Sequence, residues 1–242
     1  MGIRVLAATA LLVAVTGISC AAGTSSFTGT VGSGRMVTQE FDYRDFTGVS
    51  AGSGARVTVR QGDRYRVELR MDDNVIDRMR TDVVNGVLRF SLDPTGPFRN
   101  VRIEIDVTAP RITDLRLSGG ATGTVEMELP DDRFTTQLSG GARVSGRVVV
   151  DRLVVEGSGG STATLDGSTR SLSAEGSGGS RLLLSGVDSG DASVSLSGGS
   201  RAEITSAGRI DGSASGGSTL VHSRTAHGVT VSTSGGSTIR GR

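Results

Sequence analysis

The chain has 242 residues, with 37 Gly, six Phe, two Tyr, no Trp, one Cys and no Lys. A single cysteine cannot build an internal disulfide framework, and two histidines give no Cys/His cluster of the kind that holds zinc. The formal net charge of +1 gives no electrostatic reason to expect a nucleic acid as a partner. We therefore expect no nucleic-acid partner, no cofactor and no metal.

Residues 1–19 have the pattern of an export signal. Arg4 supplies a positive charge, and an apolar run without charges follows it over residues 5–15. This run is too short to cross a bilayer comfortably, and it matches the apolar segment of a signal peptide. No later stretch reaches about 18 apolar residues, so the sequence predicts no transmembrane helix in the mature chain.

Cys20 stands where a bacterial lipoprotein signal places the residue that is diacylated and becomes the new N-terminus. Ile18 and Ser19 suit the two positions before it, whereas Gly17 replaces the usual Leu-like residue. The alternative is ordinary cleavage close by, which gives a soluble secreted or periplasmic protein. Residues 20–38 are small and polar, which is typical of a flexible tether. We expect a membrane-anchored lipoprotein of the cell envelope, with Cys20 as its lipid attachment site.

Residues 39–110 contain most of the aromatic residues and several stretches that alternate apolar and polar side chains. Period-two alternation predicts β-strands, here over residues 57–60, 66–69, 87–90 and 101–107. Asn85-Gly86 is a turn signal between two of them, and residues 73–80 fit one or two helical turns. We expect this half to form larger coils that continue the sheet of the second half and cap its N-terminal end.

An internal repeat organises residues 111–242. Ser-Gly-Gly followed by Ala or Ser occurs seven times, at steps of 18 to 21 residues, and residues 52–55 resemble an early, degenerate copy. The period is too short for helical hairpin repeats or propeller blades, and it suits one coil of a β-solenoid. The first glycines of the seven pairs are Gly119, Gly140, Gly159, Gly178, Gly198, Gly216 and Gly235.

The residues around each glycine pair alternate between the two faces of a strand. Counted from the first glycine, positions −6, −4, −2, +4 and +6 hold Ala, Val, Ile, Leu or Phe at 25 of 35 places. At positions −5, −3, +3 and +5, only 3 of 28 residues are apolar. A flexible Gly/Ser linker has no such pattern. The repeat therefore predicts two short strands per coil around one narrow core.

Four stretches of the domain resemble a known family. They are Phe46 with residues 49–63, then residues 83–88, 101–110 and 115–120. Over about residues 40–242 the chain resembles the "putative auto-transporter adhesin, head GIN domain" family, which is common among bacterial envelope lipoproteins. The resemblance implies a right-handed β-helix-like fold and export to the envelope, and it brings no catalytic residues.

Residue pattern and resemblance together predict an all-β, single-domain parallel β-helix or β-solenoid over residues 39–242. Its coils have about 19 residues, with larger coils over 39–110 and the seven repeats over 111–242.

No set of residues matches a catalytic motif. His222 falls on an inward position, and His227 lies in an expected turn. Glu156 and Glu175 share an outward position one coil apart, a spacing that resembles the carboxylate pair of a retaining glycosidase. No aromatic residue follows Phe134 to hold a sugar ring. We predict a protein that is not an enzyme, with a carbohydrate-active β-helix enzyme as the alternative.

The outward position +3 contains only Thr and Arg, and it is the candidate interaction surface. A solvated strand face is the simplest interpretation, and a flat docking surface for a glycan, a peptide or an envelope protein is the sharper one. We predict a non-enzymatic, envelope-anchored adhesin or surface-interaction module. A periplasmic partner or sensor subunit that binds another envelope protein is a further alternative. The stripe consists of Thr122, Arg143, Thr162, Arg181, Arg201, Thr219 and Thr238.

Overall fold

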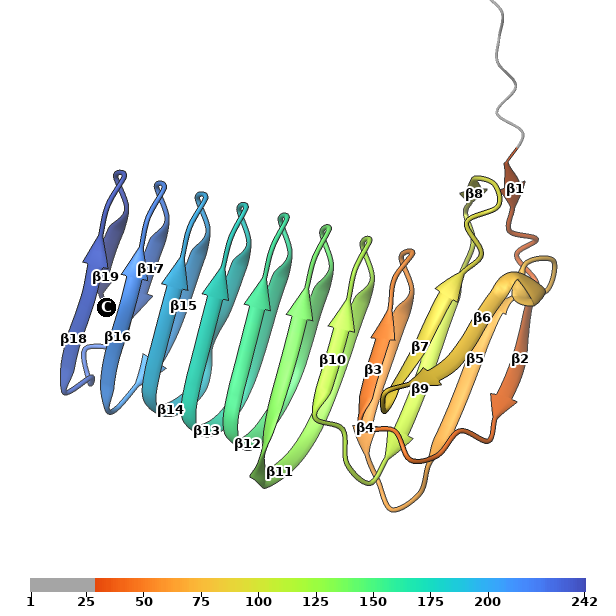
Figure 1. Ribbon diagram of the computed structural model, residues 1–242, viewed down its shortest axis with the longest axis horizontal. Coiled ribbons are helices and arrows are strands. Elements are labelled where there is room, and N and C mark those ends of the chain that lie inside the picture. The colour runs from red at the N-terminus through yellow and green to blue at the C-terminus, as the bar shows by residue number, and fades with distance from the viewer. Residues whose placement is uncertain (1–28) are drawn as a thin grey trace, which may run out of the picture.

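Strands make up most of the computed structural model, which describes residues 29–242. Figure 1 shows a long row of narrow coils with a wider group of strands at the N-terminal end. The predicted all-β solenoid is confirmed. Its strands are β3 (Gly48–Ala51), β4 (Arg56–Gln61), β10 (Asp114–Leu117), β11 (Thr122–Leu138), β12 (Arg143–Gly157), β13 (Thr162–Gly176), β14 (Arg181–Leu196), β15 (Arg201–Ser206), β16 (Arg209–Ala214), β17 (Thr219–His222), β18 (Gly228–Thr233) and β19 (Thr238–Gly241).

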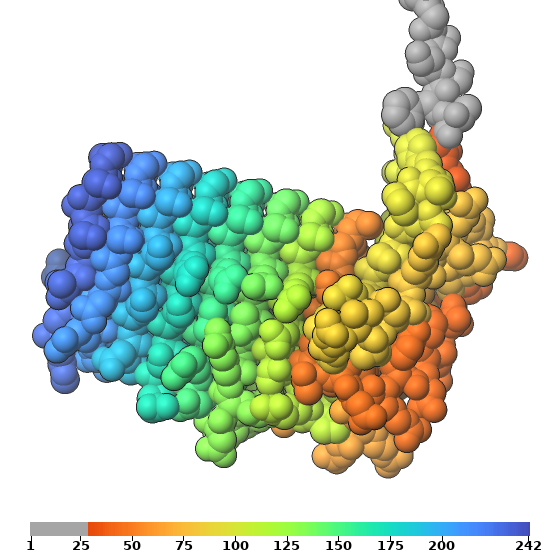
Figure 2. Space-filling view, in the orientation of Figure 1, coloured from red at the N-terminus to blue at the C-terminus, as the bar shows by residue number. Residues whose placement is uncertain are grey.

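Each coil pairs with the next in a parallel ladder, and the register follows the sequence repeat. Arg143 pairs with Thr162, which pairs in turn with Arg181, and the same holds for the strand residues from position −6 to position +5 around each glycine pair. Residues at these equal repeat positions therefore form straight rows along the solenoid axis. Beyond position +5 the register shifts between β13 and β14 and between β14 and β15. In Figure 2 the coils are successive bands, from the N-terminal strands in orange and yellow to the C-terminal coil in blue.

The Ser-Gly-Gly segments are tight turns that lie along one long edge of the solenoid (Figure 1). In the second repeat, Gly140 and Gly141 have φ angles of 58° and 79°, and the Ala142 N–H donates to the Ser139 carbonyl at 3.1 Å. Two consecutive residues with positive φ define a type I′ turn, for which Gly-Gly is a favoured sequence. Residues 52–55 make the same turn, with Ser53 and Gly54 at 55° and 72°, so the early copy is confirmed.

The core lies between the two strands of each coil. Leu153, Leu172 and Leu182, at positions −6 and +4, are fully buried, as the alternation predicts. Position +2 is also buried, although the sequence pattern did not include it, because the tight turn directs this side chain inward. Ser161, Ser180 and Ser200 occupy it, and the Ser200 hydroxyl donates to the Gly176 carbonyl at 3.0 Å.

The N-terminal half differs from the expectation of larger coils. Only residues 48–61 form a coil of the repeat type, with two strands joined by a tight turn. The repeat coils then resume at β10, after residue 113. The intervening residues and the segments before β3 contain β1 (Thr30–Val31), β2 (Met36–Phe41), β5 (Arg66–Asp72), a 3₁₀ turn (Ile76–Arg78), β6 (Met79–Val84), β7 (Val87–Leu92), β8 (Phe98–Arg99) and β9 (Ile103–Ala109).

These strands close the N-terminal end of the solenoid. Strand β7 pairs in parallel with β3, and β9 in parallel with β4, so together they act as one more coil. Beyond them the pairing becomes antiparallel, with β6 on β7, β5 on β9 and β2 on β5. The parallel edge of the first coil is thereby covered, which protects it from pairing with another chain.

A buried carboxylate binds the first described residues to the N-terminal end of the solenoid through hydrogen bonds. Asp72 is 0% exposed, and it accepts hydrogen bonds from the N–H groups of Gly34 and Arg102, both at 2.7 Å. Beside it, the Ser33 hydroxyl donates to Asp73, and this hydrogen bond lowers the pKa of the Asp73 carboxyl. The segment that precedes the solenoid is thus held at a fixed point of the domain.

Candidate binding surfaces of the solenoid

The predicted Thr/Arg stripe forms one straight row, which we call the +3 row. Each of its seven residues is the Cα partner of the next, from β11 to β19. The row has an eighth member that was not predicted, Arg56, which pairs with Thr122 in the parallel ladder between β4 and β11. The early turn at residues 52–55 was the signal for it, because Arg56 stands three positions after Ser53.

Two arginines of the row have charges that no acid among the described residues balances. Arg201 pairs with Glu203 at 2.9 Å, and Arg56 with Glu104 at 3.7 Å. Within residues 29–242, Arg143 and Arg181 form no ion pair, and both are exposed. Since neighbouring strands are about 4.7–4.9 Å apart, these two cations lie about 10 Å apart on a flat, Thr-bearing surface.

The neighbouring row at position +7 has a different charge pattern. Arg147 stands in register between Glu126 and Asp166, so its charge is flanked by an acid on either side. Of the arginines on these two rows, Arg143 and Arg181 are therefore the ones whose charge no acid of the described chain balances, and an anionic ligand gains most from contact with them.

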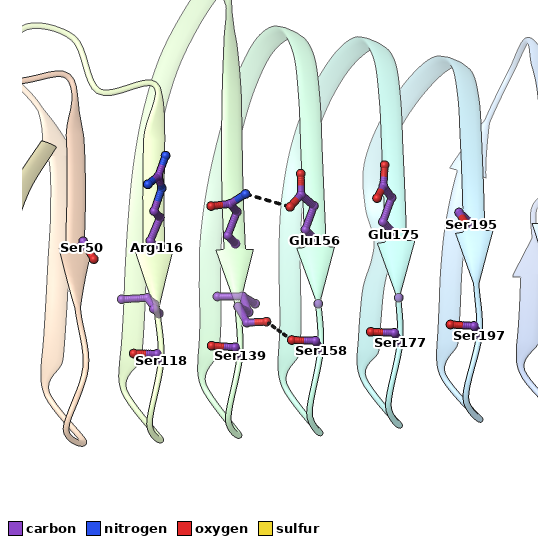
Figure 3. A pocket seen from close by; sticks show the side chains of 15 residues that line it. Ser50, Arg116, Ser118, Ser139, Glu156, Ser158, Glu175, Ser177, Ser195 and Ser197 are labelled. Atoms are coloured by element: carbon purple, nitrogen blue, oxygen red, sulfur yellow. Dashed lines mark hydrogen bonds between the residues drawn. The ribbon is translucent and has the colours of Figure 1, made fainter. Parts of the chain in front are cut away.

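The other face of the solenoid has a shallow groove of about 550 Å³. Both strands of a coil bury their inward side chains in the same core, so the outward residues of the two strands face in opposite directions. Polar side chains at position −3 form one side of the groove, and the serines before the glycine pairs lie beside them (Figure 3). The serines are Ser118, Ser139, Ser158, Ser177 and Ser197.

Glu156 and Glu175 lie in this groove, in register on β12 and β13. The Gln137 amide donates to Glu156 at 2.8 Å, and Figure 3 shows both glutamates extending in the same direction from one face. A retaining glycosidase instead places its two carboxyl groups on either side of the scissile bond. Glu156 and Glu175 are neighbours in register, as predicted. They do not face each other across a space for a substrate, which this chemistry requires.

The remaining sequence candidates do not form a site. His222 is half-buried and donates through Nδ1 to the Ser223 carbonyl at 2.8 Å, while His227 is exposed in the loop before β18. Over residues 29–242, no three His, Cys, Asp or Glu side chains are grouped so as to hold a metal ion. No helix of the described chain is long and apolar enough to cross a membrane. Cys20 lies outside the described residues.

The described residues define a class of protein: a parallel β-solenoid with a basic row on one face and a polar groove on the other. Comparison with known sequences then gives the family. Residues 45–226 match the model of the "putative auto-transporter adhesin, head GIN domain" family, and the chain belongs to that family. No protein with curated annotation matches the sequence.

Solved structures share the fold at low sequence identity. A putative adhesin from Bacteroides fragilis is similar with a TM-score of 0.82 and 17% identity, over 88% of this chain and 100% of that one. A putative lipid binding protein from Parabacteroides distasonis gives 0.70 and 16%, over 88% and 98%. A putative adhesin from Parabacteroides merdae gives 0.61 and 14%, over 88% and 99%. At these identities the likeness shows the fold alone.

Proposed function

We propose that the protein is a non-enzymatic, adhesin-like module of the cell envelope that binds anionic surface polysaccharides through the +3 row. The observation that carries this proposal is the straight row of exposed Thr and Arg in which Arg143 and Arg181 have no acidic partner among the described residues. An extended polyanion that lies along the solenoid axis contacts both cations at once. Family membership supports an adhesin-like role.

Removing the two unbalanced cations tests this function. We expect Arg143→Gln/Arg181→Gln to weaken binding of polygalacturonate oligomers about tenfold, because two exposed ionic contacts are lost. The double variant also has a smaller salt dependence of affinity, since fewer charges take part. Calorimetric titration at two salt concentrations measures both quantities.

Arg147→Gln is the matched control, because it removes the same charge from the same face beside Glu126 and Asp166. It should leave the affinity for polygalacturonate within twofold. Because the control removes one charge and the double variant two, a loss of about threefold in the control, half the double variant's loss in free energy, would show that net charge, and not the +3 row, determines binding. Tighter binding to anionic lipid vesicles than to the polysaccharide would point to a membrane surface as the ligand and contradict the proposal.

We further propose that Cys20 carries the lipid anchor of this module. The support comes from the amino-acid sequence. An apolar run follows Arg4, a cysteine stands at the end of the signal, and residues up to 38 are small and polar. An acyl chain gains about 0.8 kcal/mol per buried methylene, and two or more chains are needed for stable anchoring. The alternative cleavage without lipid gives a protein that leaves the membrane.

Replacing Cys20 by Ser distinguishes these two outcomes. In cells that process lipoproteins, the unchanged protein is expected in the detergent phase of a Triton X-114 partition, and the Cys20→Ser variant in the aqueous phase. Ser25→Ala, in the same tether, should leave the partition unchanged. Recovery of the unchanged protein from the aqueous phase, with a mature mass that lacks acyl groups, would rule out the anchor.

A further inference from the structure

The groove on the face opposite the +3 row has no part in the function proposed above. It runs along the solenoid axis, at right angles to the strands, from Ser50 on β3 to Ser195 on β14. Six strands cross it, and each contributes one residue at position −3. With strands about 4.7–4.9 Å apart, the groove is about 24 Å long. Its −3 residues are Ser50, Arg116, Gln137, Glu156, Glu175 and Ser195.

Most side-chain hydrogen-bonding groups of the groove have no partner among residues 29–242, although the Gln137 amide donates to Glu156. Of its five turn serines, only Ser158 donates within the described protein, to the Leu138 carbonyl at 3.4 Å. The Glu175 carboxylate has no hydrogen-bond or ion-pair partner among residues 29–242. A row of hydroxyls and a row of longer polar side chains therefore repeat side by side, once per coil (Figure 3).

We propose that this groove binds a linear polysaccharide that carries free amino groups. Hexose units in an extended β-1,4-linked chain advance by slightly more than the distance between neighbouring strands, about 4.7–4.9 Å. The two repeats therefore stay in step over a few units. Successive sugar units can therefore meet successive coils, each finding one serine hydroxyl and one −3 side chain. The groove has no aromatic side chain in its lining, so the contacts are hydrogen bonds and ionic contacts repeated along the chain.

An extended peptide fits this groove less well than a glycan. Peptides that bind β-proteins usually add a strand to a sheet edge, where backbone groups are free. Along the groove the backbone groups of β11, β12 and β13 already pair with the neighbouring coils. A peptide also repeats about every 3.3 Å, which does not match the spacing of the coils.

The two carboxylates of the groove, Glu156 and Glu175, outnumber its one cation, Arg116, so its charge favours an amino-bearing glycan over a neutral or acidic one. Glu156 and Glu175 are direct partners on adjacent parallel strands, and like charges in such positions oppose each other. Neither forms an ion pair in the described structure. An ammonium group bound between them relieves this repulsion, whereas a uronic acid increases it. The two faces of the solenoid thus select ligands of opposite charge.

Three glycans and one peptide test the assignment by calorimetric titration of the folded protein. We expect the β-1,4-linked glucosamine hexamer to bind more tightly than its N-acetylated form. A galacturonate hexamer binds the +3 row in the function proposed above, so Glu175→Gln and Ser177→Leu should leave its affinity within twofold. Glu175→Gln should weaken the glucosamine hexamer about tenfold, the loss of one charge-assisted contact, and change the N-acetylated hexamer less than twofold. Ser177→Leu fills the groove and should weaken both hexamers at least about tenfold.

Ser145→Leu is the matched control on the other face. Ser145 is exposed at position +5 of β12, in a row where Leu183 already occurs, so the variant is expected to fold and to bind like the unchanged protein. Circular dichroism of all three variants checks the fold. If Ser177→Leu bound the glucosamine hexamer as tightly as the unchanged protein does, the groove would not be the binding site. If hexalysine bound as tightly as the glucosamine hexamer, the assignment of a glycan as the ligand would be wrong. Neither result concerns the +3 row, which Arg143→Gln/Arg181→Gln tests separately.

Discussion

Replacing Leu182 by Asp is expected to abolish cooperative folding of the solenoid. Leu182 is fully buried, and its Cδ2 atom reaches the space that a side chain at Gly157 of the preceding coil would fill. Loss of a buried leucine side chain costs about 2–5 kcal/mol. An unpaired carboxylate in the same place adds several kcal/mol more. The total is comparable with the whole stability of a typical domain, about 5–15 kcal/mol.

Arg181→Asp is the comparison one residue away. Arg181 is exposed on the +3 row and forms no ion pair within the described chain. Its replacement should change the free energy of unfolding by no more than about 0.5 kcal/mol. Urea denaturation followed by circular dichroism measures both variants. If the two positions proved equally tolerant, the assignment of inward and outward residues in β14 would be wrong.

Gly167→Ala is expected to have the second largest effect. Gly167 lies in β13 with a φ angle of +124°, and a Cβ atom there would stand 2.1 Å from the Val148 carbonyl oxygen of the neighbouring coil. Backbone strain of about 1–3 kcal/mol therefore adds to a steric cost of about 1–3 kcal/mol. We expect a loss of at least about 3 kcal/mol, because a backbone carbonyl within a ladder cannot move aside.

The same substitution at Gly160 separates the two contributions. Gly160 is the second glycine of a turn, with a φ angle of +81° and no atom within 4 Å of an added Cβ. Only the conformational cost remains there, about 1–2 kcal/mol. Thermal or urea unfolding of the two alanine variants gives the difference. A loss at Gly160 equal to that at Gly167 would show that the contact with the preceding coil has little effect on stability.

Some parts of the fold are determined by residues that are close together in the sequence. A turn with two positive φ angles favours Gly-Gly, and period-two alternation assigns each neighbouring residue to the core or the surface. The position of the turns, the register of the coils and the +3 row therefore follow from counting along the chain. The close contact of Gly167 does not, because nothing near it in the sequence shows which carbonyl of the preceding coil it meets.

The N-terminal half was harder to predict for the same reason. Strands β5, β6, β7 and β9 alternate in the same way whether they extend the coils or pair antiparallel. Their partners lie far along the chain, and β3 pairs both with β7 and with β10. Alternation indicates a strand and its buried face, but it contains no information about the neighbour on either side.

For the candidate sites, the sequence by itself determined which residues share a row, because each row is one position of a repeat with a nearly constant period. Only the tertiary structure decided that no acid of a neighbouring coil in the described chain pairs with Arg143 or Arg181, and that the serines and the −3 residues together form a groove. Ion pairs between coils and the concavity of a surface depend on distances between side chains of different coils. Those distances are fixed only when the coils stack.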